Sequence, residues 1–286
     1  MSSVGMRRRH REKRRHAAKG RTPGGALFAL ITHTARMQFR SVIVWGLSLG
    51  LYSAAIVATF TTMDAGQMDR IADSLPEGMR EAFSLTDLST IEGLLDVRVF
   101  GFIFPLALTF FPILALSGAI AGAEERGTID VLLGNPVRRW QLVVGNFVAT
   151  AVSLLGILAI SGLSTWATAL LEDVDLTLGR TAGAFLNLWP FCLFFGGIAI
   201  LCSAIFHRRS LAIAVPGFLL VGSYLIDVIA KVSEDLEGLR DYSIFSYYGS
   251  AIKDGIDWTD FGGITSCTFV LVLLTVFAFQ RRDIYT

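Results

Sequence analysis

Residues Ala123–Leu142 read AEERGTIDVLLGNPVRRWQL and form a charged, turn-broken island in an otherwise apolar part of the chain. A long apolar run lies on each side of this island, at 99–122 and at 142–171. Each run can cross the hydrocarbon core of a membrane, which takes roughly 20 helical residues. The island is therefore predicted to turn the chain between two membrane-spanning helices.

The middle of the island has the pattern of a short amphipathic helix. Thr128 can cap its beginning, and Gly134 can end it. Asn135 and Pro136 are then typical of the cap and the first residue of the next helix. We expect the short helix to lie across the mouth of the membrane hairpin, with an apolar face that needs a partner. That face consists of residues at helical spacing: Ile129, Leu132 and Leu133.

Two pairs of like charges flank this short helix. Glu124 and Glu125 fall at the C-terminal end of the preceding span, whereas Arg138 and Arg139 fall in the first turn of the following one. Each charge opposes the macrodipole of its own helix, at a cost of about 0.3–1 kcal/mol. One interpretation is that the arginines hold the loop on the cytoplasmic side. The other is that the charge pairs and the short helix dock a partner protein.

The composition is that of a membrane protein. Apolar residues make up 53% of the 286 residues, and the mean hydropathy of +0.57 is too high for an ordinary soluble domain. All four histidines lie outside the apolar runs, which excludes a histidine site within the spans. The cysteines lie far apart inside apolar runs and are predicted to be small buried groups, not disulfides or metal ligands: Cys192, Cys202 and Cys267.

Six apolar runs within residues 42–286 predict an all-α membrane protein with six transmembrane helices. Pro105 and Pro112 are expected to bend the second helix, and Pro216 the fifth. The predicted spans are 42–61, 99–122, 142–171, 182–206, 211–230 and 261–279.

Two segments precede the first span. Residues 1–24 form a basic tail that is predicted to be disordered and cytoplasmic. The tail could contact nucleic acid, but ahead of a membrane span a topology determinant or a contact with anionic lipid explains it better. Residues 25–41 are predicted to form an interfacial helix along the cytoplasmic surface, because apolar and polar residues are set against each other from Leu27 to Arg40.

The distribution of positive charge predicts the orientation. Six spans place both termini on one side of the membrane, and 18 of the 25 lysines and arginines lie in segments on that side. By the positive-inside rule, the termini and the island Ala123–Leu142 are cytoplasmic. We therefore expect a multi-pass protein of the plasma (inner) membrane.

Motifs for catalysis and for nucleotide or metal binding are missing from the sequence. It contains no G-x-x-x-x-G-K-[ST] phosphate loop, no H-E-x-x-H and no cluster of cysteine and histidine. We therefore predict no catalytic, cofactor-binding or metal-binding residues, and no enzyme activity of this chain by itself.

Polar side chains are scarce inside the predicted spans. Asp227, near the outer end of the fifth span, and Asn187, in the fourth, are the candidates for a substrate pathway. For Asp227, an edge position that reaches interfacial water is the simpler interpretation. The scarcity argues against an ion-coupled secondary transporter, which usually keeps carboxylates or broken helices at the membrane midplane.

The island resembles the corresponding segment of the ABC-2 type permeases, which are membrane subunits of ATP-binding-cassette exporters. The shared pattern is a pair of acidic residues, Gly-Thr, paired leucines and Pro-Val-x-Arg. The interfacial helix, the six spans and an aromatic segment at 243–248 support the resemblance, whereas Asn146 departs from it, since many relatives carry lysine there. The motif residues are Glu124, Glu125, Arg126, Gly127, Thr128, Leu132, Leu133, Pro136, Val137 and Arg138.

A second resemblance concerns the substrate. Residues 75–79, LPEGM, followed by Phe83, are similar to the subgroup of antibiotic or polyketide exporters. This similarity implies a permease for multidrug efflux that moves a lipophilic antibiotic, a polyketide or a lipid-like molecule outward.

The family resemblance also implies partners. It implies a type V exporter-like dimer of six-span subunits, identical or homologous, in membrane lipid, with a separate ATPase that binds ATP and Mg at each cytoplasmic face. Residues 124–138 would be the coupling helix on that ATPase, the interfacial helix would belong to the same gate, and short helices in the outer loops would close the exit. The alternatives are a membrane scaffold or sensor that recruits a cytoplasmic protein without transport, and an ion-coupled secondary transporter.

Overall fold

The computed structural model describes residues 23–61, 90–125, 127, 138–232 and 234–281. Six helical segments in these residues are long and apolar enough to cross a membrane, which confirms the predicted all-α fold with six spans. The spans are formed by α2 (Pro23–Phe60), by α5 (Ile91–Leu95), η2 (Asp96–Ile103) and α6 (Phe104–Ser117) together, and by α9 (Arg139–Leu171), α10 (Leu178–Ile205), α11 (Arg209–Val232) and α14 (Trp258–Arg281).

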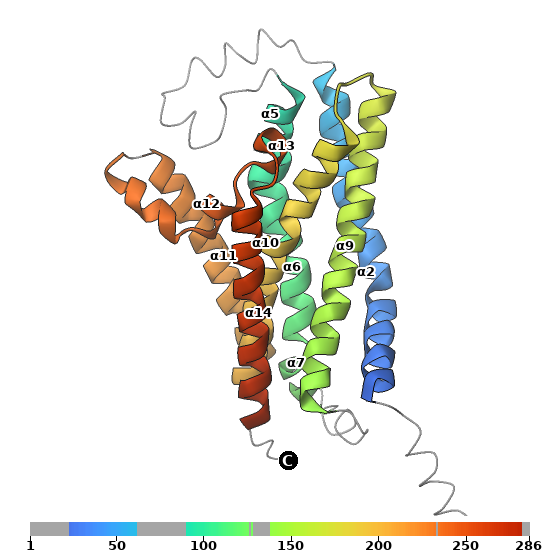
Figure 1. Ribbon diagram of the computed structural model, residues 1–286, viewed down its shortest axis with the longest axis vertical. Coiled ribbons are helices and arrows are strands. Elements are labelled where there is room, and N and C mark those ends of the chain that lie inside the picture. The colour runs from blue at the N-terminus through green and yellow to red at the C-terminus, as the bar shows by residue number, and fades with distance from the viewer. Residues whose placement is uncertain (1–22, 62–89, 126, 128–137, 233, 282–286) are drawn as a thin grey trace, which may run out of the picture.

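The six spans form one elongated bundle around α10 (Figure 1). Helix α10 packs against α6, α9, α11 and α14, and its most apolar window is 72% buried, the highest value among the spans. Helix α2 lies along α9, whereas α11 diverges from the other helices on the opposite side (Figure 1). The beginning of α2 and the end of α14 mark what we call the terminal end of the bundle, and α5 marks the loop end.

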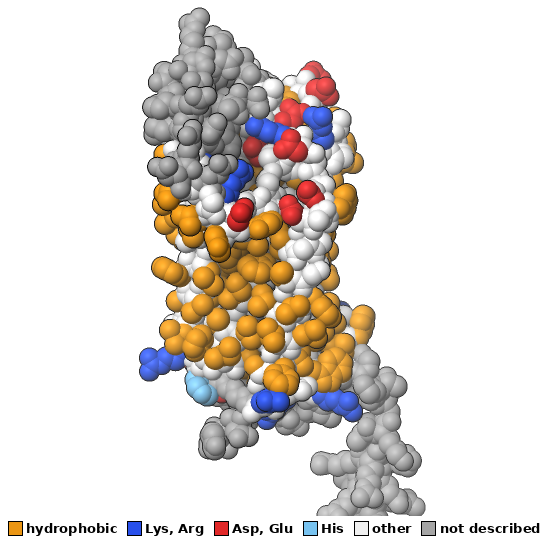
Figure 2. Space-filling view, turned by 60° about the vertical axis from the view of Figure 1, so that its left-hand side comes forward, with side chains coloured by type: hydrophobic (Ala, Val, Ile, Leu, Met, Phe, Trp, Pro, Cys, Tyr) orange, Lys and Arg blue, Asp and Glu red, His pale blue; other side chains and the backbone are white. Residues whose placement is uncertain are grey.

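The surface of the bundle is divided into an apolar band and two polar ends (Figure 2). Acidic side chains gather at the loop end, and the charges visible at the terminal end are mainly basic (Figure 2). A band of this kind is what the hydrocarbon core of a bilayer requires of the surface that it touches. The described part of the chain is therefore built to cross a membrane.

The interfacial helix predicted at 25–41 is not a separate element. Helix α2 runs without interruption through 38 residues, which is about 57 Å of helix. Its first turns lie against α9: a Cβ atom built on Gly145 would lie 2.6 Å from Leu30 Cδ2 and 3.5 Å from Leu27 Cδ1. These leucines face a neighbouring helix, which a single segment of sequence does not reveal. The position of residues 25–41 at the membrane surface stays a prediction.

The second span begins earlier than predicted. It runs over Ile91–Ser117, not 99–122, because the helix continues through the π-helical segment η2 at its start. At its other end the helix stops at Ser117, and Ala121–Glu125 forms a separate short helix, α7. The other five spans contain their predicted ranges to within one residue, although α2 begins well before residue 42. Pro105 lies in the first turn of α6, directly after η2, and Pro112 lies inside α6.

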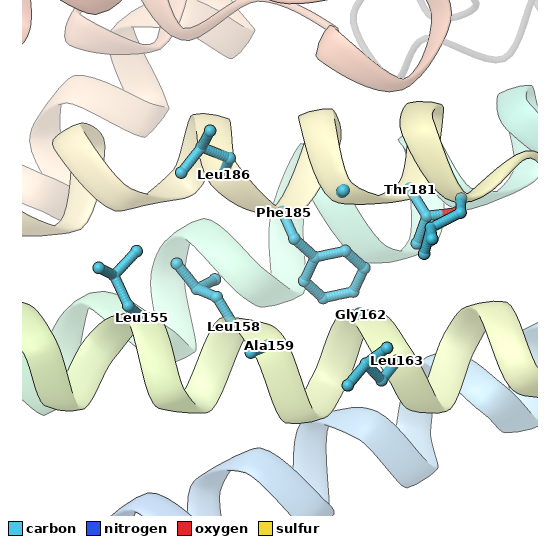
Figure 3. A pocket seen from close by; sticks show the side chains of 10 residues that line it. Leu155, Leu158, Ala159, Gly162, Leu163, Thr181, Phe185 and Leu186 are labelled. Carbon is cyan, nitrogen blue, oxygen red and sulfur yellow. The ribbon is translucent and has the colours of Figure 1, made fainter.

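An apolar groove of about 380 Å³ lies between α9 and α10 near the loop end (Figure 3). Phe185 of α10 reaches across to Gly162 of α9, where a Cβ atom would lie only 3.3 Å from the ring. The hydroxyl of Thr181 is the polar side-chain group in the lining, and it donates to the carbonyl of Thr177, the residue that caps α10. The groove is lined by Leu155, Leu158, Ala159, Gly162, Leu163, Leu178, Thr181, Ala182, Phe185 and Leu186.

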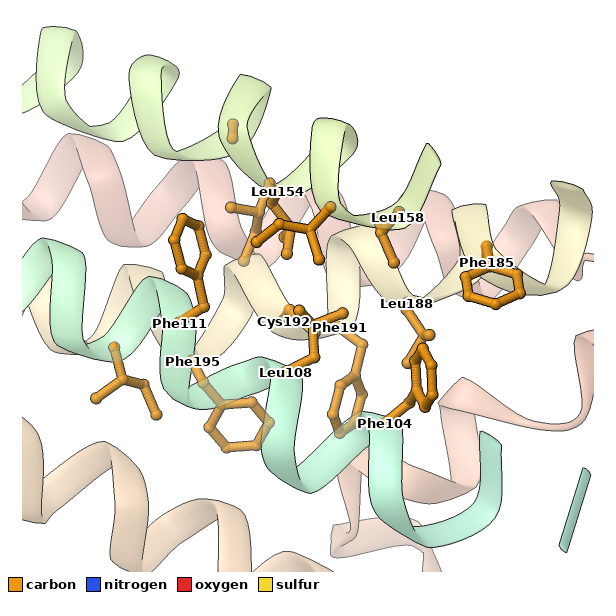
Figure 4. Packing of buried hydrophobic residues seen from close by; sticks show 14 of the residues in the cluster. Phe104, Leu108, Phe111, Leu154, Leu158, Phe185, Leu188, Phe191, Cys192 and Phe195 are labelled. Carbon is orange, nitrogen blue, oxygen red and sulfur yellow. The ribbon is translucent and has the colours of Figure 1, made fainter. Parts of the chain in front are cut away.

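The core lies between α6, α9 and α10 and is built mainly of phenylalanine and leucine (Figure 4). Phe191 and Phe195 stack edge to face with ring centroids 5.4 Å apart, and Phe104 meets Phe185 in the same way at 5.5 Å. Cys192 and Cys202 are buried as predicted, whereas Cys267 is exposed on α14. The prediction failed for Cys267 because an apolar run in a membrane helix has a lipid-facing side as well as a packed one.

We predict that Gly196→Ala destabilises the fold. A Cβ atom at this position would lie 2.9 Å from Pro112 Cβ and 3.1 Å from Leu116 Cδ1, so α10 and α6 would have to separate. The expected loss is about 1–3 kcal/mol in the free energy of unfolding, measured in detergent micelles. Gly222→Ala in α11 is the matched control, because no atom lies within 4 Å of its Cβ position. A smaller loss for Gly196→Ala than for the control would contradict this packing.

Candidate functional site

Part of the predicted coupling segment lies among the described residues. Gly127 has a φ of +63°, and its N–H donates to the carbonyl of Glu124 at 2.9 Å, so glycine suits this position two residues after α7. Glu124, Glu125 and Arg138 are described as well. The remaining predicted site residues, together with the short amphipathic helix, lie outside the described residues: Arg126, Thr128, Leu132, Leu133 and Pro136.

The two glutamates lie at the beginning of α11. Glu125 Oε1 accepts a hydrogen bond of 2.7 Å from the backbone N–H of Arg209, the first residue of that helix. Glu124 Oε1 lies 3.6 Å from Nδ1 of His207, two residues earlier in the chain. A carboxylate is favourable at this position, because the first N–H groups of a helix have no partner in the helix and carry partial positive charge.

The arginines lie at the end of α14 and the beginning of α9. Arg139 Nη1 donates at 3.1 Å to the carbonyl of Phe279, which lies in the last turn of α14. The guanidinium of Arg139 also lies 5.6 Å from the centre of the Phe279 ring. Arg138 caps α9, and its backbone N–H donates to Gln141 Oε1 at 2.9 Å. A cation is favourable at the C-terminal end of α14, since the last carbonyls of a helix carry partial negative charge.

Glu125 and Arg139, whose charges oppose the dipoles of their own helices, thus complement the dipoles of neighbouring helices. Glu125 faces the beginning of α11, and Arg139 faces the end of α14. These contacts offset the unfavourable interaction of each charge with its own helix dipole. The signs of the charges therefore do not by themselves require a partner protein. They do tie both flanks of the segment 126–138 to helices that lie far away in the sequence.

The two candidate pathway residues make different contacts, Asp227 within α11 and Asn187 between α10 and α12. Asp227 is 4% exposed and pairs with Lys231 one turn later, at 2.8 Å, whereas its other oxygen has no hydrogen-bond partner among the described residues. Asn187 Nδ2 donates to the carbonyl of Tyr248 at 2.7 Å. Neither residue lines the groove between α9 and α10. A role in a pathway stays a prediction for both.

Asp96 is a buried charge that the sequence analysis missed. It accepts a hydrogen bond of 2.6 Å from the hydroxyl of Ser250, and Lys253 Nζ lies 3.7 Å from its second oxygen. The sequence does carry a signal that Asp96 is buried, because the apolar residues Ile91, Leu94 and Leu95 just before it extend the helical pattern of the second span. Burial of Asp96 therefore fixes the loop after α11 onto the second span.

Residues 26–284 match the protein family described as ABC-2 family transporter protein. The chain belongs to the ABC-2 family. A comparison with curated proteins gave no match. Proteins of this family are membrane components of transporters, and membership implies pairing with an ATP-binding-cassette ATPase subunit. Glu125 and Arg138, the described residues on either side of the predicted coupling segment of this ABC-2 protein, end α7 and cap α9.

The ABC-2 chain carries three short helices in its last polar loop: η3 (Glu234–Tyr242), α12 (Ile244–Tyr248) and α13 (Ala251–Asp254). Short helices of this kind were implied by the family resemblance. Helix α12 packs its Phe245 and Tyr248 rings on Phe191 of α10, with centroids 4.9 and 5.0 Å apart. Its first N–H, from Ile244, donates to the Ser223 hydroxyl of α11 at 3.0 Å. Closure of an exit by these helices stays a prediction.

Two pKa shifts accompany these contacts in the ABC-2 chain. Burial raises the pKa of the Tyr248 hydroxyl well above its usual value, and the nearby carboxylate of Asp96 adds to the effect. Hydrogen bonds from the backbone N–H groups of Thr259 and Asp260, at 2.8 and 3.3 Å, lower the pKa of Asp257. Tyr248 therefore stays neutral in its packed position, and Asp257 stays ionised as it caps α14.

We predict that Asp227 and Lys231 are energetically coupled. Asp227→Asn and Lys231→Met each leave one largely buried partner without its counter-charge, at an expected cost of about 1–3 kcal/mol in the free energy of unfolding. The double variant is expected to lose clearly less than the sum of the two, which unfolding in detergent micelles measures. Strictly additive losses would exclude the pair as a stabilising contact.

Proposed function

We propose that this protein is the permease subunit of an ATP-driven exporter, and that a separate ATPase binds at the terminal end of the bundle and powers it. The observation that carries the proposal is the placement of the family motif. Residues 124–138 contain this motif, and the described residues at its two ends are tied to α11 through Glu125 and to α14 through the neighbouring Arg139. A force applied to this segment therefore has a direct route into several spans at once.

The terminal end is proposed to face the cytoplasm. The uneven distribution of lysine and arginine supports this orientation, since basic residues dominate the terminal end and acidic ones gather at the loop end (Figure 2). Both termini would then be cytoplasmic, in the plasma (inner) membrane. This is also the side on which ATP is available to a partner.

The partner ATPase is proposed to supply all of the nucleotide chemistry. ATP and Mg would bind there, because this chain has no phosphate-loop motif. The apolar face of Leu132 and Leu133 would enter a cleft on the ATPase, and the charged flanks would fix its orientation. Closure of the ATPases on ATP would push this coupling helix and favour an outward-facing packing over an inward-facing one.

The substrate is proposed to be lipophilic, such as an antibiotic, a polyketide or a lipid-like molecule. The groove between α9 and α10 supports this choice, because its one side-chain hydroxyl, on Thr181, is already bonded to Thr177, which caps α10 (Figure 3). A polar solute would lose its hydrogen bonds to water in such a groove without gaining others. The LPEGM motif at 75–79 supports the same class of substrate through its similarity to the antibiotic-exporter subgroup.

A second permease copy, or a homologue, is proposed to complete the transporter. The spans α11 and α14 are the least covered ones, with 22% of their apolar windows buried. They carry large exposed apolar side chains, among them Phe218 and Phe269. Membrane lipid would cover whatever part of this surface the second subunit leaves free.

We predict that Leu132→Asp prevents binding of the ATPase. A carboxylate in the apolar face would have to enter the cleft without a counter-charge, which costs several kcal/mol and should weaken co-purification at least about tenfold. The measurement is the amount of ATPase that co-elutes with the tagged permease, together with ATP hydrolysis by the complex. Leu236→Asp in η3 is the matched control, because this leucine is exposed at the other end of α11.

The proposal fails if Leu132→Asp retains a fully active complex. It also fails if the wild-type permease moves a lipophilic probe into inverted vesicles without any nucleotide-hydrolysing partner. Dependence of such movement on a proton gradient and on Asp227 would instead favour secondary transport.

A further inference from the structure

The joint between α6 and α7 is held by residues of α10 and α11. Helix α6 ends at Ser117, and α7 begins at Ala121 after a tight turn in which the N–H of Ala119 donates to Leu116 O at 3.1 Å. This joint separates the second span from the segment that contains the family motif. Polar groups at the two helix ends need partners here, because the surroundings are largely apolar.

Ser203 of α10 bridges the two helix ends. Its hydroxyl donates to the carbonyl of Ser117 at 3.0 Å and accepts from the N–H of Ala121 at 2.9 Å. The side chain is completely buried, so water does not compete for either hydrogen bond. A movement of α7 away from α10 would leave a buried donor and a buried acceptor unpaired, which is costly in a low-dielectric environment.

Arg209 binds both helices on the other side of the joint. Its backbone N–H donates to Glu125 Oε1 of α7 at 2.7 Å, and its side-chain Nη2 donates to Leu114 O of α6 at 3.2 Å. Leu114 lies in the last turn of α6, where the carbonyls lack partners within the helix and a cation is favourable. The first residue of α11 is therefore attached to both α6 and α7.

We propose that Ser203 and Arg209 are positioning residues that make α7, the end of α10 and the beginning of α11 move as one unit. A displacement of the segment 126–138 then reaches α11, the span that diverges from the bundle and is only 22% buried in its apolar window. The rest of α10, whose apolar window is 72% buried, is the packed support for this unit. The inference rests on the proposed function, since it assumes that an ATPase displaces that segment.

The test is amide hydrogen exchange of the full permease–ATPase complex in lipid nanodiscs, with and without a non-hydrolysable ATP analogue. In the wild type, the analogue is expected to change the exchange rate by about threefold or more at both 121–125 and 209–213. In Ser203→Ala, and in the double variant Glu125→Ala/Arg209→Gln, which removes both the acceptor of the Arg209 backbone N–H and the side-chain contact to Leu114, the change at 121–125 is expected to persist while the change at 209–213 falls to background. Arg208→Gln, an exposed neighbour in the same turn, should behave as the wild type.

A purely structural role would raise exchange at both sites equally, with and without nucleotide, and that result would overturn the inference. A wild-type complex in which the nucleotide changes the exchange rate only at 121–125 would also overturn the inference. This measurement on the wild type does not depend on the folding of any variant. Failure of wild-type permease and ATPase to co-elute removes the proposed function, and the inference with it. Co-elution with independent responses at the two sites removes the inference alone.

Discussion

The terminal end of this bundle depends on side chains that pair the ends of helices. A helix end leaves backbone N–H or carbonyl groups without partners, and these groups are costly where water is scarce. Here they are satisfied by side chains from distant segments: Glu125 at the beginning of α11, Arg139 at the end of α14, and Ser203 between α6 and α7. The terminal end is held together in this way around the segment that contains the family motif.

This construction links the packing of the bundle to its proposed work. The strongly buried α10 supports α6, α9 and α14, whereas α11 has little cover of its own. At the loop end, Asp96 and Asn187 hold α12 and α13 against the second and fourth spans. A transporter needs both features, namely a rigid support and elements that can exchange one packing for another.

Much of the fold could be predicted from the sequence, because a membrane span is recognised by length and composition alone. What failed depends on contacts across long sequence separations. Glu125 meets Arg209 over 84 residues, Arg139 meets Phe279 over 140, and Asp96 meets Ser250 over 154. The local sequence therefore shows only the unfavourable charges of the island, and it placed the second span at 99–122 instead of 91–117. It also gives no sign that Leu27 and Leu30 face Gly145.

The central claim is that residues 124–138 are held by an ATPase on the cytoplasmic side. Its most direct test is the labelling of a single cysteine, Asn135→Cys, after Cys192, Cys202 and Cys267 are replaced by alanine. A membrane-impermeant maleimide is expected to react with it in inverted vesicles and not in right-side-out ones, and added ATPase should slow that reaction. Labelling from the outer face, or a rate that the ATPase leaves unchanged, would contradict the account.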